Sequence, residues 1–181
     1  VRSADAVVYS SAITQANPEL VEAKRLGIPV LKRAQALAEL MQEKTVITVA
    51  GSHGKTTTAS LAACLLLDAG LSPTAAIGGI LRNLDNNACL GNGRFFVAEA
   101  DESDGSFLYY RPHYSIITNI DREHLDYYHS FAQAQEAFKK FLYSIQPGGC
   151  AFCCGDDVYL KPMLQGYAHK YVLFGMRNTA H

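Results

Sequence analysis

The segment VITVAGSHGKTTTASLAACLLLDAG, residues 46–70, decides the fold of this 181-residue chain. It begins as a β-branched strand pattern, passes through two glycines, and continues as a long apolar helix pattern. A turn of small residues between a strand and a helix lets consecutive backbone N–H groups converge on an anion, and the helix dipole favours that anion further. We therefore predict a phosphate-binding loop at residues 51–57.

The predicted loop supplies the side chains that such a site needs. Lys55 is placed to reach terminal phosphates, and Thr56 offers a hydroxyl to Mg²⁺. The usual spacing would put the first glycine at Val49, so only a GxxGKT core is present. The alternative interpretation is a glycine-rich turn with an exposed lysine, in which His53 is solvent-facing rather than a substrate contact. The cofactor-binding residues that we predict are Gly51, Ser52, His53, Gly54, Lys55, Thr56 and Thr57.

Strand-like and helix-like segments alternate along the rest of the chain. Short apolar runs predict strands at residues 6–9, 28–31, 45–50, 95–100, 114–120, 150–154 and 171–174. Helical spacing predicts helices at residues 18–27, 33–44, 56–69 and 130–145. This alternation predicts an α/β fold with a mostly parallel sheet flanked by helices, and we place a domain boundary at the helix of residues 33–44 or just after it.

Two polar clusters follow predicted strands, where parallel sheets bind their ligands. The first contains four carboxylates in six residues, at positions 99–104. If the strand continues, alternation puts Glu99 and Asp101 on one face, so that at least one carboxylate can approach a phosphate-bound metal. The second cluster contains His124, which could ligate a second cation, and Asp126, which could orient it. The alternatives are a solvated acidic loop and a plain surface histidine.

The composition argues against two classes of partner. With 16 basic and 17 acidic residues, the formal net charge is -1, which gives no overall attraction for nucleic acid or an anionic membrane. The sequence shows neither a secretory apolar region nor a run of membrane-spanning length, and its five cysteines are an odd number. We therefore expect a reduced, cytoplasmic protein without nucleic-acid partners or membrane insertion. Cys150 and Cys153 form a CxxC, but in a buried strand they favour packing over zinc.

The motifs together resemble a known family. AGSHGKTTT, AEADESD and TNIDREHLD, in that order and spacing, resemble the central ATPase domain of the Mur ligases of bacterial cell-wall synthesis. The upstream YSSAITQANPEL and IPVLKRAQALAELM are most similar to the alanine-adding branch of that family. The resemblance covers nearly the full chain, and the short GxxGKT is the family's own form of the phosphate loop.

The resemblance implies a domain arrangement and a reaction. Residues 1–43 would be the end of a Rossmann-like, UDP-sugar-binding domain, and residues 44–181 an incomplete P-loop ATPase-like central domain, without the C-terminal ligase domain. We expect such a fragment to be inactive alone. The full enzyme would use ATP and Mg²⁺ to form an acyl phosphate on UDP-N-acetylmuramate, which the amine of L-alanine attacks.

The resemblance also assigns residues. Lys55, Glu99 and His124 would be catalytic, Thr56 and Glu99 would hold one Mg²⁺, and His124 would help hold a second. The substrate would contact Ser11, Ala12 and Gly79, although Gly78 and Gly79 would equally suit a turn or bulge. Some relatives carry a carbamylated lysine, but Lys139 and Lys140 lie off the apolar stripe of their helix and we do not expect it here. Two alternatives stay open: a sibling ligase that adds an intact tripeptide, and a P-loop NTPase switch.

Overall fold

A computed structural model describes residues 1–81 and 86–177 of the chain. The chain divides into two compact units, Val1–Gln42 and Glu43–His181. Across the described residues, every helix is too short or too polar to cross a membrane.

The first unit contains two strands and two helices. Strand β1 (Val7–Tyr9) pairs in parallel with β2 (Val30–Lys32). Helix α1 (Pro18–Arg25) starts with a proline, and the side chain of Asn17 accepts the N–H of Glu19 at 2.9 Å. β2 starts two residues later than predicted, after Pro29, which has no N–H for a strand ladder. Helix α2 (Arg33–Leu40) ends four residues before its predicted end at residue 44.

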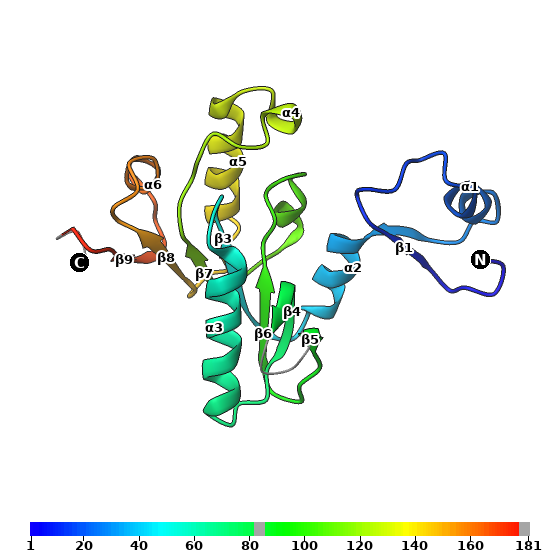
Figure 1. Ribbon diagram of the computed structural model, residues 1–181, viewed down its shortest axis with the longest axis horizontal. Helices are drawn as coiled ribbons and strands as arrows, with labels where there is room; N and C mark the ends of the chain where they lie inside the picture. Colours follow the sequence, from blue (N-terminus) through cyan, green and yellow to red (C-terminus); the bar gives the residue numbers. More distant parts are fainter. Residues whose placement is uncertain (82–85, 178–181) are drawn as a thin grey trace. The chain divides into compact units, whose positions relative to one another are not determined.

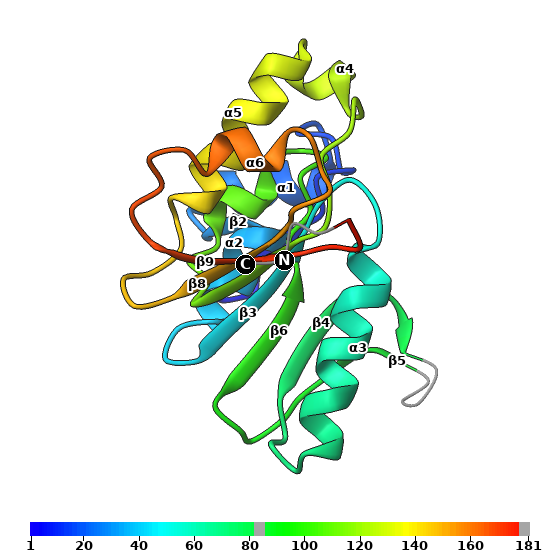
Figure 2. The ribbon, with the colours of Figure 1, turned by 90° about the vertical axis from the view of Figure 1, so that its left-hand side faces the viewer.

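The second unit is built on a seven-stranded sheet with the order β5-β4-β6-β3-β7-β8-β9 (Figures 1 and 2). All neighbours are parallel except β4 and β5, which confirms the predicted mostly parallel sheet. The strands are β3 (Thr45–Ala50), β4 (Thr74–Leu81), β5 (Asn86–Cys89), β6 (Phe95–Glu99), β7 (Tyr114–Ile117), β8 (Cys150–Cys154) and β9 (Lys170–Phe174).

Helices cover both faces of this sheet. Helix α3 (Lys55–Asp68) packs on β3, β6 and β4, while α5 (Phe131–Leu142) and α6 (Leu160–Met163) lie on the opposite side (Figures 1 and 2). Under α3 the side chains are small, with Ala59 and Ala63 of the helix buried in the same cluster as Ala75 of β4. On the other side Phe107, in the short helix η1 (Ser106–Tyr109), stacks on Phe141 of α5 at 4.8 Å between ring centroids.

Five of the described elements were not predicted. β4 was missed because the segment around Gly78 and Gly79 is rich in alanine and glycine, so it lacks the β-branched pattern of the other strands. β5 was missed because its sequence, NNAC, contains two asparagines, which are depleted in strands. The single turns η1, α4 (Leu125–Tyr128) and α6 are too short to show a helical period. By contrast, β3 and β8 have the predicted bounds.

The sheet brings three strand ends together. β3 lies between β6 and β7, with Val49 opposite Glu99 and Ala50 opposite Ile117. Because the three strands are parallel, the segments that follow them leave the sheet at the same edge. The phosphate-loop, carboxylate and histidine motifs are these segments.

Candidate active site

The loop between β3 and α3 requires its two glycines. Gly51 has φ 131°, and a Cβ added there would lie 2.2 Å from Thr118 Oγ1 and 2.9 Å from the Asn119 carbonyl oxygen. Gly54 has φ 82° and caps the N-terminus of α3. The conformation and the close neighbour therefore both exclude a side chain at Gly51.

The segment after β7 anchors this loop. The backbone N–H of His53 donates to Asn119 Oδ1 at 2.8 Å, and the Asn119 amide donates back to the His53 carbonyl at 3.0 Å. The Thr118 hydroxyl also donates to the His53 carbonyl, at 2.6 Å, and Asp121 N–H donates to Ser52 Oγ at 2.8 Å. Sequence reasoning included Thr118 and Asn119 in the motif TNIDREHLD but gave them no role, although their position directly after a central strand was a usable signal.

The side chain of Lys55, the first residue of α3, folds back over the loop that precedes it. Its ammonium donates to the Gly51 carbonyl at 2.7 Å and lies 3.4 Å from the Ser52 carbonyl. The first N–H groups of a helix have no intrahelical acceptor, so the start of α3 adds further donors beside this ammonium. The arrangement can neutralise a bound polyphosphate.

The ammonium of Lys55 also meets a buried carboxylate, Glu102, which sequence reasoning named but gave no role. Nζ lies 2.9 Å from both carboxylate oxygens and hydrogen-bonds to Oε1. Glu102 is 2% exposed, and its Oε2 has no hydrogen-bond partner within the part of the chain that the structure describes. Burial raises the pKa of the Glu102 carboxyl, although Lys55 opposes this shift.

Thr56 and Glu99, the predicted metal ligands, are in contact. The Thr56 hydroxyl donates to Glu99 Oε2 at 3.2 Å, and Glu99 Oε1 accepts the Gly78 N–H at 2.7 Å. A hydroxyl and a carboxylate are the oxygen donors that suit Mg²⁺ beside phosphates. β6 ends at Glu99, and Asp101 Oδ1 accepts the N–H of Ser103 at 3.0 Å. The strand therefore does not continue to Asp101, and the alternation that would place Asp101 on the face of Glu99 does not apply.

His124 also lies close to Glu102. Its Nε2 is 3.7 Å from Glu102 Oε1, and ligand atoms of Glu102, Glu123 and His124 lie within 4.8 Å of one another. The carboxylate beside His124 is therefore Glu102, and Asp126 forms no ion pair with His124 among the described residues. A histidine with two carboxylates can hold a divalent cation.

Four other predicted residues are exposed. His53 is half exposed, and its Nε2 is 3.3 Å from Asp121 Oδ2. Thr57 is exposed on the first turn of α3. Ser11 and Ala12 lie in an exposed loop of the first unit, where the Ala12 N–H donates to Ser10 Oγ at 3.3 Å.

Two secondary expectations concern groups away from the phosphate loop. Lys139 and Lys140 are exposed on α5. Cys150 and Cys153 are buried free thiols, and burial raises the pKa of Cys153 to about 12. This burial favours packing in the strand over a role as thiolate ligands.

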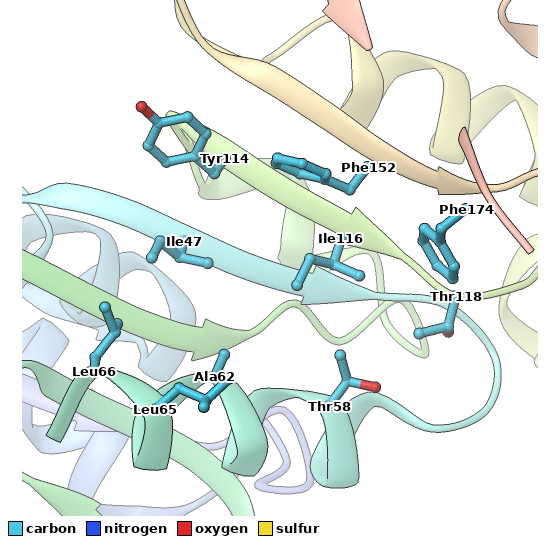
Figure 3. A pocket seen from close by; sticks show the side chains of 10 residues that line it. All are labelled: Ile47, Thr58, Ala62, Leu65, Leu66, Tyr114, Ile116, Thr118, Phe152 and Phe174. Atoms are coloured by element: carbon cyan, nitrogen blue, oxygen red, sulfur yellow. The ribbon is translucent and has the colours of Figure 1, made fainter. Parts of the chain in front are cut away.

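A large groove lies near the loop but has a different chemistry. It encloses about 620 Å³ between α3 and the strands β3, β7, β8 and β9. Figure 3 shows the strand side chains facing the middle of the helix. Its lining residues are Ile47, Thr58, Ala62, Leu65, Leu66, Tyr114, Ile116, Thr118, Phe152 and Phe174. Only hydroxyl groups interrupt this apolar lining, so the groove offers no charge to a phosphate.

A strand leads through a glycine loop into a helix that begins with Lys-Thr, and the adjacent parallel strand supplies a carboxylate. These features define a P-loop nucleotide-binding domain. The family model for the Mur ligase middle domain matches residues 49–181, and that for the Mur ligase family catalytic domain matches residues 1–45. The chain belongs to the Mur ligase family.

Individual relatives agree with this assignment. The chain is 52% identical over 169 residues to UDP-N-acetylmuramate–L-alanine ligase of Carboxydothermus hydrogenoformans, covering 93% of this chain and 36% of the relative. A solved UDP-N-acetylmuramate–alanine ligase from Thermotoga maritima has TM-score 0.81 and 29% identity, covering 96% of this chain and 39% of that one.

A third relative is a ligase of UDP-N-acetylmuramate and a tripeptide, L-alanyl-γ-D-glutamyl-meso-diaminopimelate, from Neisseria meningitides. Its structure has TM-score 0.82 and 31% identity, covering 94% of this chain and 58% of that one. The chain spans little more than a third of the length of the curated alanine ligase that it matches.

Proposed function

We propose that the protein containing this chain joins L-alanine to the carboxylate of UDP-N-acetylmuramate, with cleavage of ATP to ADP and phosphate, in peptidoglycan synthesis in the cytoplasm. The observation that carries the proposal is the meeting of Lys55, Thr56 and Glu99 at one edge of the sheet, with His124 close by. The 52% identity to an alanine ligase supports the choice of substrates.

The reaction is phosphoryl transfer followed by acyl transfer. The muramoyl carboxylate attacks the γ-phosphorus of ATP, and the bond to the β-phosphate oxygen breaks to release ADP. The amine of L-alanine then attacks the acyl phosphate through a tetrahedral intermediate, loses a proton, and expels phosphate. Two anions must approach each other in the first step, so the protein's main task is to position them and neutralise charge.

The residues of the site divide this task between them. Lys55 and the N–H groups at the start of α3 bind and orient the phosphates. Thr56 and Glu99 would hold Mg²⁺, and their oxygens, 3.2 Å apart at the end of the loop, fit that ion. Bound Mg²⁺ supplies charge neutralisation on the phosphates.

A second cation would sit at His124, beside Glu102 and Glu123. The fit is supported by the ligand atoms of Glu102, Glu123 and His124, which lie within 4.8 Å of one another. Glu102 Oε2 is buried and forms no hydrogen bond in the described part of the chain, although Lys55 Nζ lies 2.9 Å from it. A cation held at His124 would add positive charge beside Glu102, in addition to the ammonium of Lys55, and would help to accommodate a substrate carboxylate.

Residues of the first unit complete the substrate assignment. We propose that Val1–Gln42 belongs to a UDP-sugar-binding domain and that Ser11 and Ala12 contact the substrate. Their exposed loop can present backbone N–H groups to a diphosphate.

The tripeptide ligase is the second candidate function. Its solved structure is as similar to this chain as that of the alanine ligase, with TM-scores of 0.82 and 0.81. The fold of this region therefore does not separate the two substrates, whereas the 52% identity supports L-alanine.

The test is a substrate-dependence assay on the intact gene product, with ADP release measured under MgATP. We expect release only when UDP-N-acetylmuramate and L-alanine are both present, with the amide product detected by mass spectrometry. Release with the tripeptide but not with L-alanine would identify the sibling ligase. Release that needs neither substrate would indicate an NTPase switch and contradict the proposal.

A further inference from the structure

Strand β4 places two consecutive glycines, Gly78 and Gly79, against the two side chains assigned to Mg²⁺. The Gly78 N–H donates to Glu99 Oε1 at 2.7 Å, and Glu99 Oε2 accepts the Thr56 hydroxyl at 3.2 Å. Backbone of β4, carboxylate of β6 and hydroxyl of α3 thus form one hydrogen-bonded chain.

Backbone conformation does not explain glycine at these positions. Neither residue is among the positive-φ glycines of the described chain, so an alanine at either position would not be strained by its backbone φ angle. The reason is instead steric, because a Cβ at Gly78 would lie 2.9 Å from Glu99 Oε2. That oxygen would have to move away from the Thr56 hydroxyl.

The contact at Gly79 is closer and less easily relieved. A Cβ there would lie 2.7 Å from Thr56 Cγ2, the methyl group of a β-branched side chain. Thr56 carries its methyl and hydroxyl on the same carbon, so rotation that removes the clash also moves Oγ1 away from Glu99. A single methyl group on β4 therefore misplaces the hydroxyl ligand.

We propose that Gly78 and Gly79 are positioning residues for the Mg²⁺ site: they let β4 close on Glu99 and Thr56 and hold the two ligand groups together. This inference rests on the proposed function, and it differs from the sequence-based assignment of Gly79 to the substrate. In this account Gly79 acts through Thr56 and needs no contact with the sugar.

The test is a double-mutant cycle on the intact gene product, with Mn²⁺ as the probe. Calorimetry measures Mn²⁺ affinity in the presence of a non-hydrolysable ATP analogue, and circular dichroism checks the fold of each variant. We expect Gly79→Ala to weaken Mn²⁺ binding by roughly 10–100-fold, the range for groups that orient metal ligands. In the Thr56→Ser background, which lacks Cγ2 but keeps a hydroxyl, the same substitution should cost less than about threefold.

Equal costs of Gly79→Ala in the two backgrounds would overturn the inference, because the lost affinity would not come from the contact with Thr56 Cγ2. Unchanged Mn²⁺ binding in Gly79→Ala would overturn it as well. If Gly79→Ala does not fold, Gly78→Ala tests the same account through Glu99, and wild-type affinity in that variant would contradict it. Failure of the unsubstituted protein to bind Mn²⁺ with the analogue would instead contradict the proposed function.

Discussion

Helix α3 contributes to two regions of very different character. Its first residues, Lys55 and Thr56, lie in the cluster at the strand ends, where an ion pair and hydrogen bonds join them to Glu102 just after β6 and to Glu99 of β6. Leu65 and Leu66, near its C-terminal end, line the 620 Å³ groove, whose surface is almost entirely apolar. The groove is therefore not a site that suits phosphates. In this fold the chemistry lies where parallel strands end.

Of the substitutions that distinguish the strand-end cluster from the groove, replacement of Lys55 is expected to have the largest effect on activity. Replacing Lys55 with alanine removes the ammonium that meets the phosphates, and we expect a loss of ~3 kcal/mol or more of transition-state stabilisation. The measurement is kcat/KM of the intact gene product for ADP release. The matched control is Lys139→Ala, an exposed lysine of α5, which should leave kcat/KM unchanged. Near-normal turnover of the Lys55 variant would refute the assignment of the loop.

A smaller effect is expected at Glu102, where the direction in which folding stability changes with pH is the observation that matters. Because burial raises the pKa of its carboxyl, the folded chain holds this proton more tightly than the unfolded chain does. Folding then becomes less favourable as pH rises from below the ordinary carboxyl pKa through the raised value. Relative to Glu102→Gln, the wild-type chain should lose stability over that interval.

Urea unfolding of both chains at a series of pH values measures this difference. Glu136→Gln, at an exposed position on α5, is the control and should show no comparable pH dependence relative to wild type. A wild-type advantage over Glu102→Gln that grows with pH would mean that Lys55 outweighs burial and lowers the pKa.

The smallest effect is expected in the groove. Leu65 is 69% exposed, so Leu65→Gln should change the free energy of unfolding by no more than about 0.5 kcal/mol. Nucleotide affinity of the intact gene product, measured by calorimetry, should stay within roughly twofold, since the phosphate ligands lie elsewhere. A tenfold loss of affinity would show that the groove takes part in nucleotide binding and would break the comparison.

Much of the site was predictable because its signals are local. The strand, the glycines and the helix that carry Lys55 and Thr56 follow one another in the chain, so their spacing alone predicts how they fold. The rule that ligands collect beyond strand ends pointed to the clusters that contain Glu99 and His124, and the family resemblance assigned the metal-ligand roles to these two residues. The structure brings four of these residues close together at the strand ends: Lys55, Thr56, Glu99 and His124. Their roles remain proposals.

The rest depends on contacts between distant segments. Nothing in AEADESD distinguishes the buried carboxylate of Glu102 from its partly buried neighbours Asp101 and Asp104, since its burial comes from packing against Lys55 and the segment around His124. β4 is a strand because its alanines and glycines fit under α3 and beside Glu99, which a propensity scale does not register. The groove is likewise formed by residues of α3 and of the strands and loop beside it, so no single stretch of sequence predicts it.

The most direct test of the account is a crystal structure of the intact gene product with Mn²⁺ and a non-hydrolysable ATP analogue, in which anomalous scattering locates the metal. We predict an Mn²⁺ peak within coordination distance of Thr56 Oγ1 and Glu99, with the terminal phosphates at Lys55. Phosphates bound in the apolar groove, or a nucleotide-bound metal away from both Thr56 and Glu99, would contradict the account.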